Sequence, residues 1–228
     1  WGVFALSGVC VYLLFIRSLR RTSFFTLYSN TELRSEATQP KHESFIKSLS
    51  VIILICICMG AGYRTFINFT TLFLTDIVKI SAAASDSIFS LFVLAGAIGS
   101  LSSFYVAKRI GLKKAITLEF AIASIGMCLF PTVFFQSIPL LVVILLISGY
   151  VLYATYPVLY SIIGEVASFG GRGKSYGFVM SIIYIGGVAQ SYIGGQLAQI
   201  TNDLSAVYLL GSAIVLLAVL ASTKLPSP

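Results

Sequence analysis

Long apolar blocks separated by short charged segments are the dominant pattern of this chain. Uncharged or nearly uncharged blocks occupy residues 1–16, 48–75, 87–107, 175–202 and 204–223. A helix needs about 20 apolar residues to cross a bilayer. The strands of a membrane barrel would instead alternate apolar and polar residues. Each block therefore predicts one membrane-spanning helix.

One further block is too long for a single helix. Residues 120–164 contain no charge over 45 positions. Pro131 and Pro139, with Gln136 and Ser137 between them, predict a turn that divides this block. The chain is then expected to be an all-α membrane protein with seven transmembrane helices.

The composition excludes a water-soluble fold. Hydrophobic residues make up 57% of the chain, charged residues make up 10%, and the mean hydropathy is +0.96. Soluble domains carry about 25% charged residues. The cysteines, Cys10, Cys56, Cys58 and Cys128, all lie in apolar blocks. We interpret them as packing residues rather than as a disulfide or metal site.

Lysine and arginine alternate sharply between successive gaps. Thirteen of the 15 basic residues lie in the first, third and fifth gaps and in the carboxyl tail, and the other gaps hold only Lys79. Cytoplasmic loops concentrate basic residues. We therefore expect the amino terminus outside and the carboxyl terminus in the cytoplasm. The net charge of +7 is explained by this bias and needs no nucleic-acid partner.

The only sizeable polar stretch is residues 17–47, which we interpret as a cytoplasmic linker. The chain begins at Trp1, directly in apolar sequence. We expect that an amino-terminal half of the parent protein is missing, with 1–16 as its last helix. Residues 48–228 would then form a bundle of six helices.

Two polar stretches carry a family pattern. Residues 107–114 are similar to a basic loop found in one family of membrane proteins. Arg109, Gly111, Lys113 and Lys114 match the basic and glycine positions of that loop. Lys108 stands where the family has an acidic residue, and Phe104 stands where it has a glycine. The second stretch is Gly164-Glu165-Val166 followed by residues 172–177, Arg-Gly-Lys-Ser-Tyr-Gly. With the order of one helix, a linker and six helices, they resemble the carboxyl-terminal part of a major facilitator superfamily transporter.

The resemblance implies a fold and a function. The spans would be the sixth to twelfth helices of a transporter with two six-helix halves. The implied function is secondary active transport of a small solute, anionic or polar, by alternating access. The implied partners are the solute, the lipid bilayer of a plasma or inner membrane, and the missing amino-terminal half.

Arg64 is the only charge well inside a predicted span. A charge at the bilayer centre costs at least about 2.5–3.5 kcal/mol, and such residues usually line polar cavities. Arg64 belongs to a polar stripe at helical spacing, made of Gly60, Arg64, Asn68, Thr71 and Thr75. We predict a site for an anionic or polar solute that includes Tyr63, Arg64 and Asn68. The alternative is an arginine that snorkels outward or bonds a helix carbonyl.

The fifth span carries tyrosines on one face. Tyr153, Tyr156 and Tyr160 follow helical spacing, and Pro157 should kink the helix between them. We predict that Tyr153 and Tyr156 bind solute and that Pro157 takes part in gating. Ordinary aromatic packing is the alternative.

Small residues at helical spacing predict close helix contacts in two spans. They are Gly187, Ser191 and Gly195 in one span, and Gly96 with Ser100 and Gly99 with Ser103 in another.

Charged residues near the cytoplasmic ends of the spans are candidates for a gate. We predict that Glu119 or Glu165 pairs with Arg109 or Arg172 when the cytoplasmic side of the transporter closes. A proton-carrying role for Glu119 is left open.

Two rival classes fit less well. An enzyme needs clustered titratable or nucleophilic side chains, and one linker histidine, His42, with eight scattered carboxylates does not supply them. We therefore expect no enzyme activity, no cofactor and no metal site. A seven-helix receptor would share the orientation, but the last span has no internal lysine for a retinal Schiff base.

Overall fold

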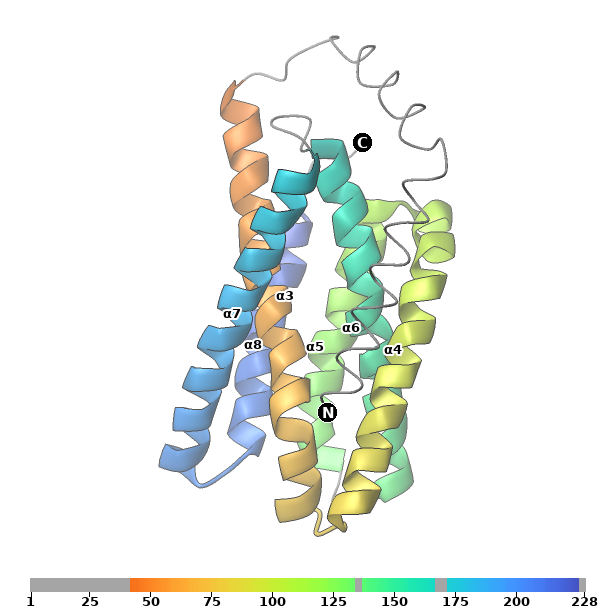
Figure 1. Ribbon diagram of the computed structural model, residues 1–228, viewed down its shortest axis with the longest axis vertical. Helices are drawn as coiled ribbons and strands as arrows, with labels where there is room; N and C mark the ends of the chain where they lie inside the picture. The colour runs from red at the N-terminus through yellow and green to blue at the C-terminus, as the bar shows by residue number, and fades with distance from the viewer. Residues whose placement is uncertain (1–41, 134–136, 167–171, 226–228) are drawn as a thin grey trace, which may run out of the picture. The chain divides into compact units, whose positions relative to one another are not determined.

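The structure, a computed structural model, describes residues 42–133, 137–166 and 172–225. All but the first few of these belong to one compact unit, Ile46–Pro228. Its elements are six helices, joined by short connections (Figure 1): α3 His42–Asp76, α4 Ala82–Ile110, α5 Leu112–Val133, α6 Ile138–Val166, α7 Arg172–Thr201 and α8 Ser205–Ser222.

Each of these helices is long and apolar enough to cross a membrane, so the described ranges contain six such helices and not seven. The predicted first span, residues 1–16, lies outside the described residues, as does most of the predicted linker. The predicted linker ends at residue 47, and its last six residues, 42–47, are helical as the first part of α3.

Several helices extend beyond the uncharged blocks that predicted them, although the bounds of α8 differ from the prediction by only one residue at each end. Helix α5 begins at Leu112, eight residues before the predicted block, and includes Lys113, Lys114 and Glu119. Charged residues near helix ends keep their polar atoms in water while their stems cover apolar surface. A helix therefore continues past the point where its uncharged stretch ends.

The connection between α4 and α5 is the single residue Gly111. Its φ of 87° lies in a region that side chains disfavour, so glycine suits this position. Its backbone N–H donates to the Ala107 carbonyl over 2.9 Å. Lys108 and Arg109 in the last turn of α4 complement the helix dipole. We call the end of the bundle that carries Lys108, Arg109, Lys113 and Lys114 the basic end.

The predicted turn within residues 120–164 is confirmed between Val133 and Ile138, although Pro131 lies inside α5 rather than in the turn. Ser137 accepts a hydrogen bond from the Leu140 N–H over 3.2 Å at the start of α6. Pro139 follows in the first helical turn, where no N–H partner is needed.

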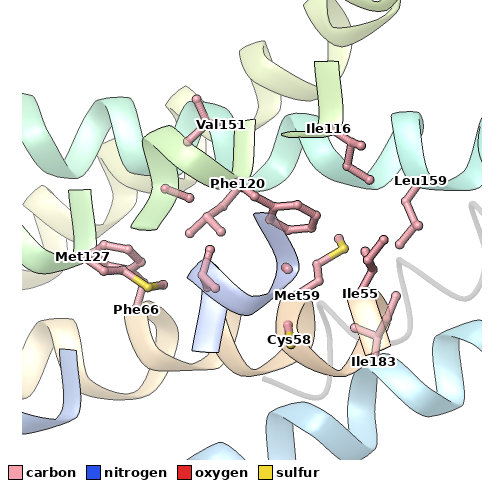
Figure 2. Packing of buried hydrophobic residues seen from close by; sticks show 14 of the residues in the cluster. Ile55, Cys58, Met59, Phe66, Ile116, Phe120, Met127, Val151, Leu159 and Ile183 are labelled. Atoms are coloured by element: carbon pink, nitrogen blue, oxygen red, sulfur yellow. The ribbon is translucent and has the colours of Figure 1, made fainter. Parts of the chain in front are cut away.

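The buried core joins the helices through aromatic side chains. Phe66 of α3, Phe92 of α4, Phe130 of α5 and Tyr208 of α8 form one cluster, in which the Phe130 and Tyr208 ring centroids are 4.8 Å apart. Figure 2 shows a neighbouring part of the core, where Met59 of α3 and Phe120 of α5 point toward one another.

Glycines bring two helix pairs into backbone contact. A Cβ on Gly99 of α4 would overlap the Tyr150 backbone of α6, and one on Gly60 of α3 would overlap the Ile183 carbonyl of α7. Close approach through small residues is a main source of helix association in membranes. The packing prediction is therefore confirmed for Gly96, Gly99 and Gly187, but a Cβ on Gly195 would meet nothing within 4 Å.

Candidate functional site

A cavity of about 280 Å³ lies between α3, α4, α6 and α7. Its lining residues are Gly60, Tyr63, Arg64, Ser100, Tyr153, Tyr156, Met180, Ile183 and Tyr184. The structure thus brings together four of the five residues that the sequence assigned to solute binding: Tyr63, Arg64, Tyr153 and Tyr156.

Arg64 reaches the cavity across a glycine of α7. A Cβ on Gly187 would lie 2.6 Å from Arg64 Cγ and 3.3 Å from Arg64 Nε, so a larger residue there would displace the side chain. The guanidinium carbon lies 5.8 Å from the centroid of the Tyr184 ring, which is a cation–π distance. Gly187 therefore makes room for Arg64, and Tyr184 provides a surface for its charge.

Among the described residues, the guanidinium has no counter-charge. No acidic residue lines the cavity. Within the described ranges, the guanidinium forms no hydrogen bond or ion pair with the protein. Arginine presents its N–H donors in a planar fork that matches a carboxylate or phosphate. The donors of Arg64 are thus available to a solute in the cavity.

Tyrosine rings from α3 and α6 form another part of the cavity lining. The Tyr63 hydroxyl donates to the Tyr153 hydroxyl over 2.9 Å, which joins α3 to α6. The Tyr63 ring packs edge-to-face against Tyr153 and Tyr156, with centroids 5.2 and 5.6 Å apart. The row continues along α6 toward the basic end through Tyr160, whose ring meets Tyr176 of α7.

Pro157 leaves a gap in the hydrogen bonding of α6. Proline has no N–H, so the carbonyl four residues earlier, at Tyr153, loses its helical donor. Ser100 of α4 fills this gap, because its hydroxyl donates to the Tyr153 carbonyl over 3.0 Å. Pro157 itself lines a second cavity of about 400 Å³ nearer the basic end, together with Ser103, Phe104 and Lys108.

Asn68, the fifth predicted binding residue, is not among those that line the cavity. Its side-chain amide donates to Ser191 Oγ of α7 over 2.6 Å. The Ser191 hydroxyl in turn donates to the Gly187 carbonyl over 2.8 Å. In this structure Asn68 therefore links α3 to α7 next to the glycine on which Arg64 packs.

Glu119 lies deeper than the sequence suggested. It exposes 6% of its surface, and its Oε2 atom has no hydrogen-bond partner. It is on the face of α5 that packs against α6, because it lies two turns before Gly126, whose Cβ position meets Ser148 of α6. It forms no ion pair with Arg109, which is exposed at the end of α4. The side chains of Glu165 and Arg172 lie outside the described residues.

Sequence reasoning missed three residues on the α7 wall: Met180, Ile183 and Tyr184. A signal for two of them was present. Met180, Tyr184, Gly187 and Ser191 are spaced by four, three and four residues, so the small-residue stripe continues on the same helix face as an apolar and aromatic wall.

No group of three or more histidine, cysteine or carboxylate side chains that could hold a metal ion occurs in the part of the chain that the structure describes. Cys56 and Cys58 are free and buried in the core, and Cys128 is free and exposed. The described cavity is thus lined by hydroxyls, aromatic rings and one guanidinium, without a nucleophile beside a base.

The family model of the Major Facilitator Superfamily matches residues 52–228. The chain belongs to the major facilitator superfamily. It is therefore an integral, multi-pass membrane protein of a family of transporters and not of enzymes. A search of the curated proteins found no match.

Solved structures share the fold at low sequence identity. The inward-open xylose transporter XylE from E. coli has a TM-score of 0.67 and 17% identity, covering 80% of this chain and 48% of XylE. FucP in the outward conformation has a TM-score of 0.66 and 14% identity, covering 86% and 48%. A bacterial homologue of the iron transporter ferroportin has a TM-score of 0.62 and 17% identity, covering 88% and 52%. The chain spans about half the length of these transporters.

Proposed function

We propose that the protein moves a small solute with an anionic group across a membrane by alternating access, and that the Arg64 cavity is this half's share of the binding site. The observation that carries the proposal is the guanidinium of Arg64, which lies in a cavity between four helices and has no counter-charge among the residues that the structure describes. A charge at this depth is costly, so its presence is typical of a solute or ion pathway.

The structural relatives do not identify the solute. Their titles name a xylose transporter and a homologue of an iron transporter, which differ in chemistry although they share the fold. The solute must therefore be argued from this cavity. The same family membership gives no support to the alternative of a seven-helix receptor.

Alternating access requires helices that can change shape, and α6 is suited to this. The hydrogen bond that Pro157 removes is replaced by one from Ser100, on a different helix. The part of α6 beyond Pro157 can therefore bend when α4 and α6 shift against each other. We propose that Arg109, Glu119, Glu165 and Arg172 contribute to closure at the basic end.

The proposed orientation places the basic end in the cytoplasm, following the bias of lysine and arginine. An amino-terminal half of the parent protein would supply the remaining wall of the cavity, as expected for a transporter built from two repeats. The proposed location is a plasma or inner membrane.

Transport by the full-length protein in proteoliposomes tests the proposal. The probes are radiolabelled phosphate, succinate and benzoate, each with wild-type protein and with Arg64→Ala. Arg64→Ala should reduce uptake of at least one anion at least tenfold, and Arg64→Lys should restore it poorly because a point charge replaces the planar fork. Undiminished uptake of every transported anion by Arg64→Ala would remove the basis of the proposal.

A further inference from the structure

The cavity offers one charge and little other hydrogen bonding. Apart from Arg64, its lining consists of four tyrosines, Ser100, Gly60, Met180 and Ile183. Ser100 already donates to the Tyr153 carbonyl, and the Tyr63 hydroxyl already donates to Tyr153. No asparagine, glutamine, histidine, lysine or acidic residue lines this cavity. On this half of the site a solute therefore meets one guanidinium, a few hydroxyls and otherwise carbon.

This lining does not suit a polyol. Each hydroxyl that leaves water needs a new hydrogen-bond partner, and an unpaired one is penalised. A sugar would need several such partners, and this half of the site supplies only Arg64 and a few tyrosine hydroxyls. The lining also does not suit a doubly charged anion, because Arg64 can neutralise only one charge and the second would lie among apolar groups.

The shape of the wall favours a flat, unsaturated body. Tyr63, Tyr153, Tyr156 and Tyr184 line the cavity, and the Tyr63 ring already packs edge-to-face against Tyr153 and Tyr156. Another aromatic ring can continue such packing with favourable quadrupole contacts. This half's share of the cavity, about 280 Å³, has room for a single ring with a short substituent.

We propose that the solute is a small aromatic monocarboxylate, with its carboxylate bound by Arg64 and its ring held among Tyr63, Tyr153, Tyr156 and Tyr184. This inference rests on the proposed function, since it names the class of solute for the same cavity. In this arrangement Arg64 selects the charge, and the tyrosines select the ring.

Binding to the full-length protein in nanodiscs, measured by calorimetry, tests this assignment. Benzoate is the probe, benzyl alcohol is a matched ring without the charge, and cyclohexanecarboxylate is a matched charge without the aromatic ring. Benzoate should bind more tightly than either. Arg64→Ala should weaken benzoate binding at least tenfold and leave benzyl alcohol unchanged, because it removes a charge-assisted pair.

Tyr156→Leu tests the contribution of the tyrosine rings to binding. It should weaken benzoate binding about threefold to tenfold and cyclohexanecarboxylate binding much less. Tyr192→Leu is the matched control, because Tyr192 is an exposed tyrosine of α7 outside the cavity and its replacement should change neither.

Two contrary results have different meanings. Arg64-dependent uptake of phosphate, succinate or radiolabelled xylose without benzoate binding would overturn the solute class and leave the proposed transport intact. Uptake and binding that are unaffected by Arg64→Ala for every probe would overturn both.

Discussion

Among the described residues, Arg64 and Glu119 are the two ionisable side chains held well inside the bundle, and their surroundings differ. Arg64 lines a cavity between four helices, and its guanidinium meets the face of Tyr184. Glu119 lies between α5 and α6, exposes 6% of its surface, and leaves Oε2 without a partner.

The difference shows that an ionisable side chain inside the bundle is not always a binding residue. A cavity allows water or a solute to solvate Arg64, so its charge can be used for binding. Glu119 lines neither of the two described cavities, and a buried group without a partner lowers stability. Depth along the helix alone therefore does not identify a binding residue, whereas an opening beside it does.

Thiol labelling should show the largest contrast. In a full-length background without native cysteines, Arg64→Cys should react with a small, water-soluble methanethiosulfonate faster than Glu119→Cys by on the order of 100-fold, because the reactive thiolate needs water. Labelling rates are followed by mass spectrometry. Equal rates would mean that the two sites do not differ in access.

The binding cavity can be altered by substituting Gly187, against which Arg64 packs. Gly187→Ala should displace the arginine, weaken benzoate binding about tenfold and destabilise the protein by about 1–3 kcal/mol through overpacking. Calorimetry and thermal unfolding in detergent measure the two effects. Gly195→Ala, where a Cβ meets open space on the same helix, should change neither. An unaltered affinity in Gly187→Ala would contradict the described packing of Arg64 against Gly187.

Replacing the buried Glu119 should stabilise the protein, which is the opposite of the effect expected for Gly187→Ala. Glu119→Met keeps the approximate shape and removes the unpartnered oxygen, so it should raise the free energy of unfolding by about 1–2 kcal/mol. Arg64→Met, on the cavity side, should change stability by less than this. Chemical unfolding in detergent compares the variants, and a destabilised Glu119→Met would show that the carboxyl has a structural partner.

The smallest effect concerns the contact between α4 and α6, which borders the cavity. Ser100→Ala should cost about 1 kcal/mol because it leaves the Tyr153 carbonyl without a donor. In a Pro157→Ala background the helix regains its own N–H donor, so the same substitution should cost little. A double-mutant cycle measures this coupling, and additive effects would argue against the replacement of one bond by the other.

Much of the helix order was predictable, because lipid leaves only long apolar helices as a solution for these blocks. The site was partly predictable as well. Arg64 is the only charge in its apolar block, and Tyr153 and Tyr156 share a helix face. The depth of Glu119 was hidden because the charges at residues 113 and 114 obscured the start of α5.

Tyr184 was harder to predict than Arg64. The spacing of Tyr184 from Gly187 and Ser191 places it on the small-residue face of α7, but its importance depends on which helix lies opposite that face. The contact of α3 with α7 decides this, through the backbone approach of Gly60 to Ile183. Pairings between helices more than 100 residues apart cannot be obtained from the periodicity of either helix alone.

The packing of Arg64 against Gly187 also restricts the order in which these two positions can be substituted during evolution. While the arginine is present, every larger residue at position 187 collides with it, so that route is closed. Once a smaller residue replaces the arginine, position 187 is released and can acquire a side chain. A return to arginine would then be blocked until the glycine is restored, which makes loss of this cation a step that is easy to take and hard to reverse.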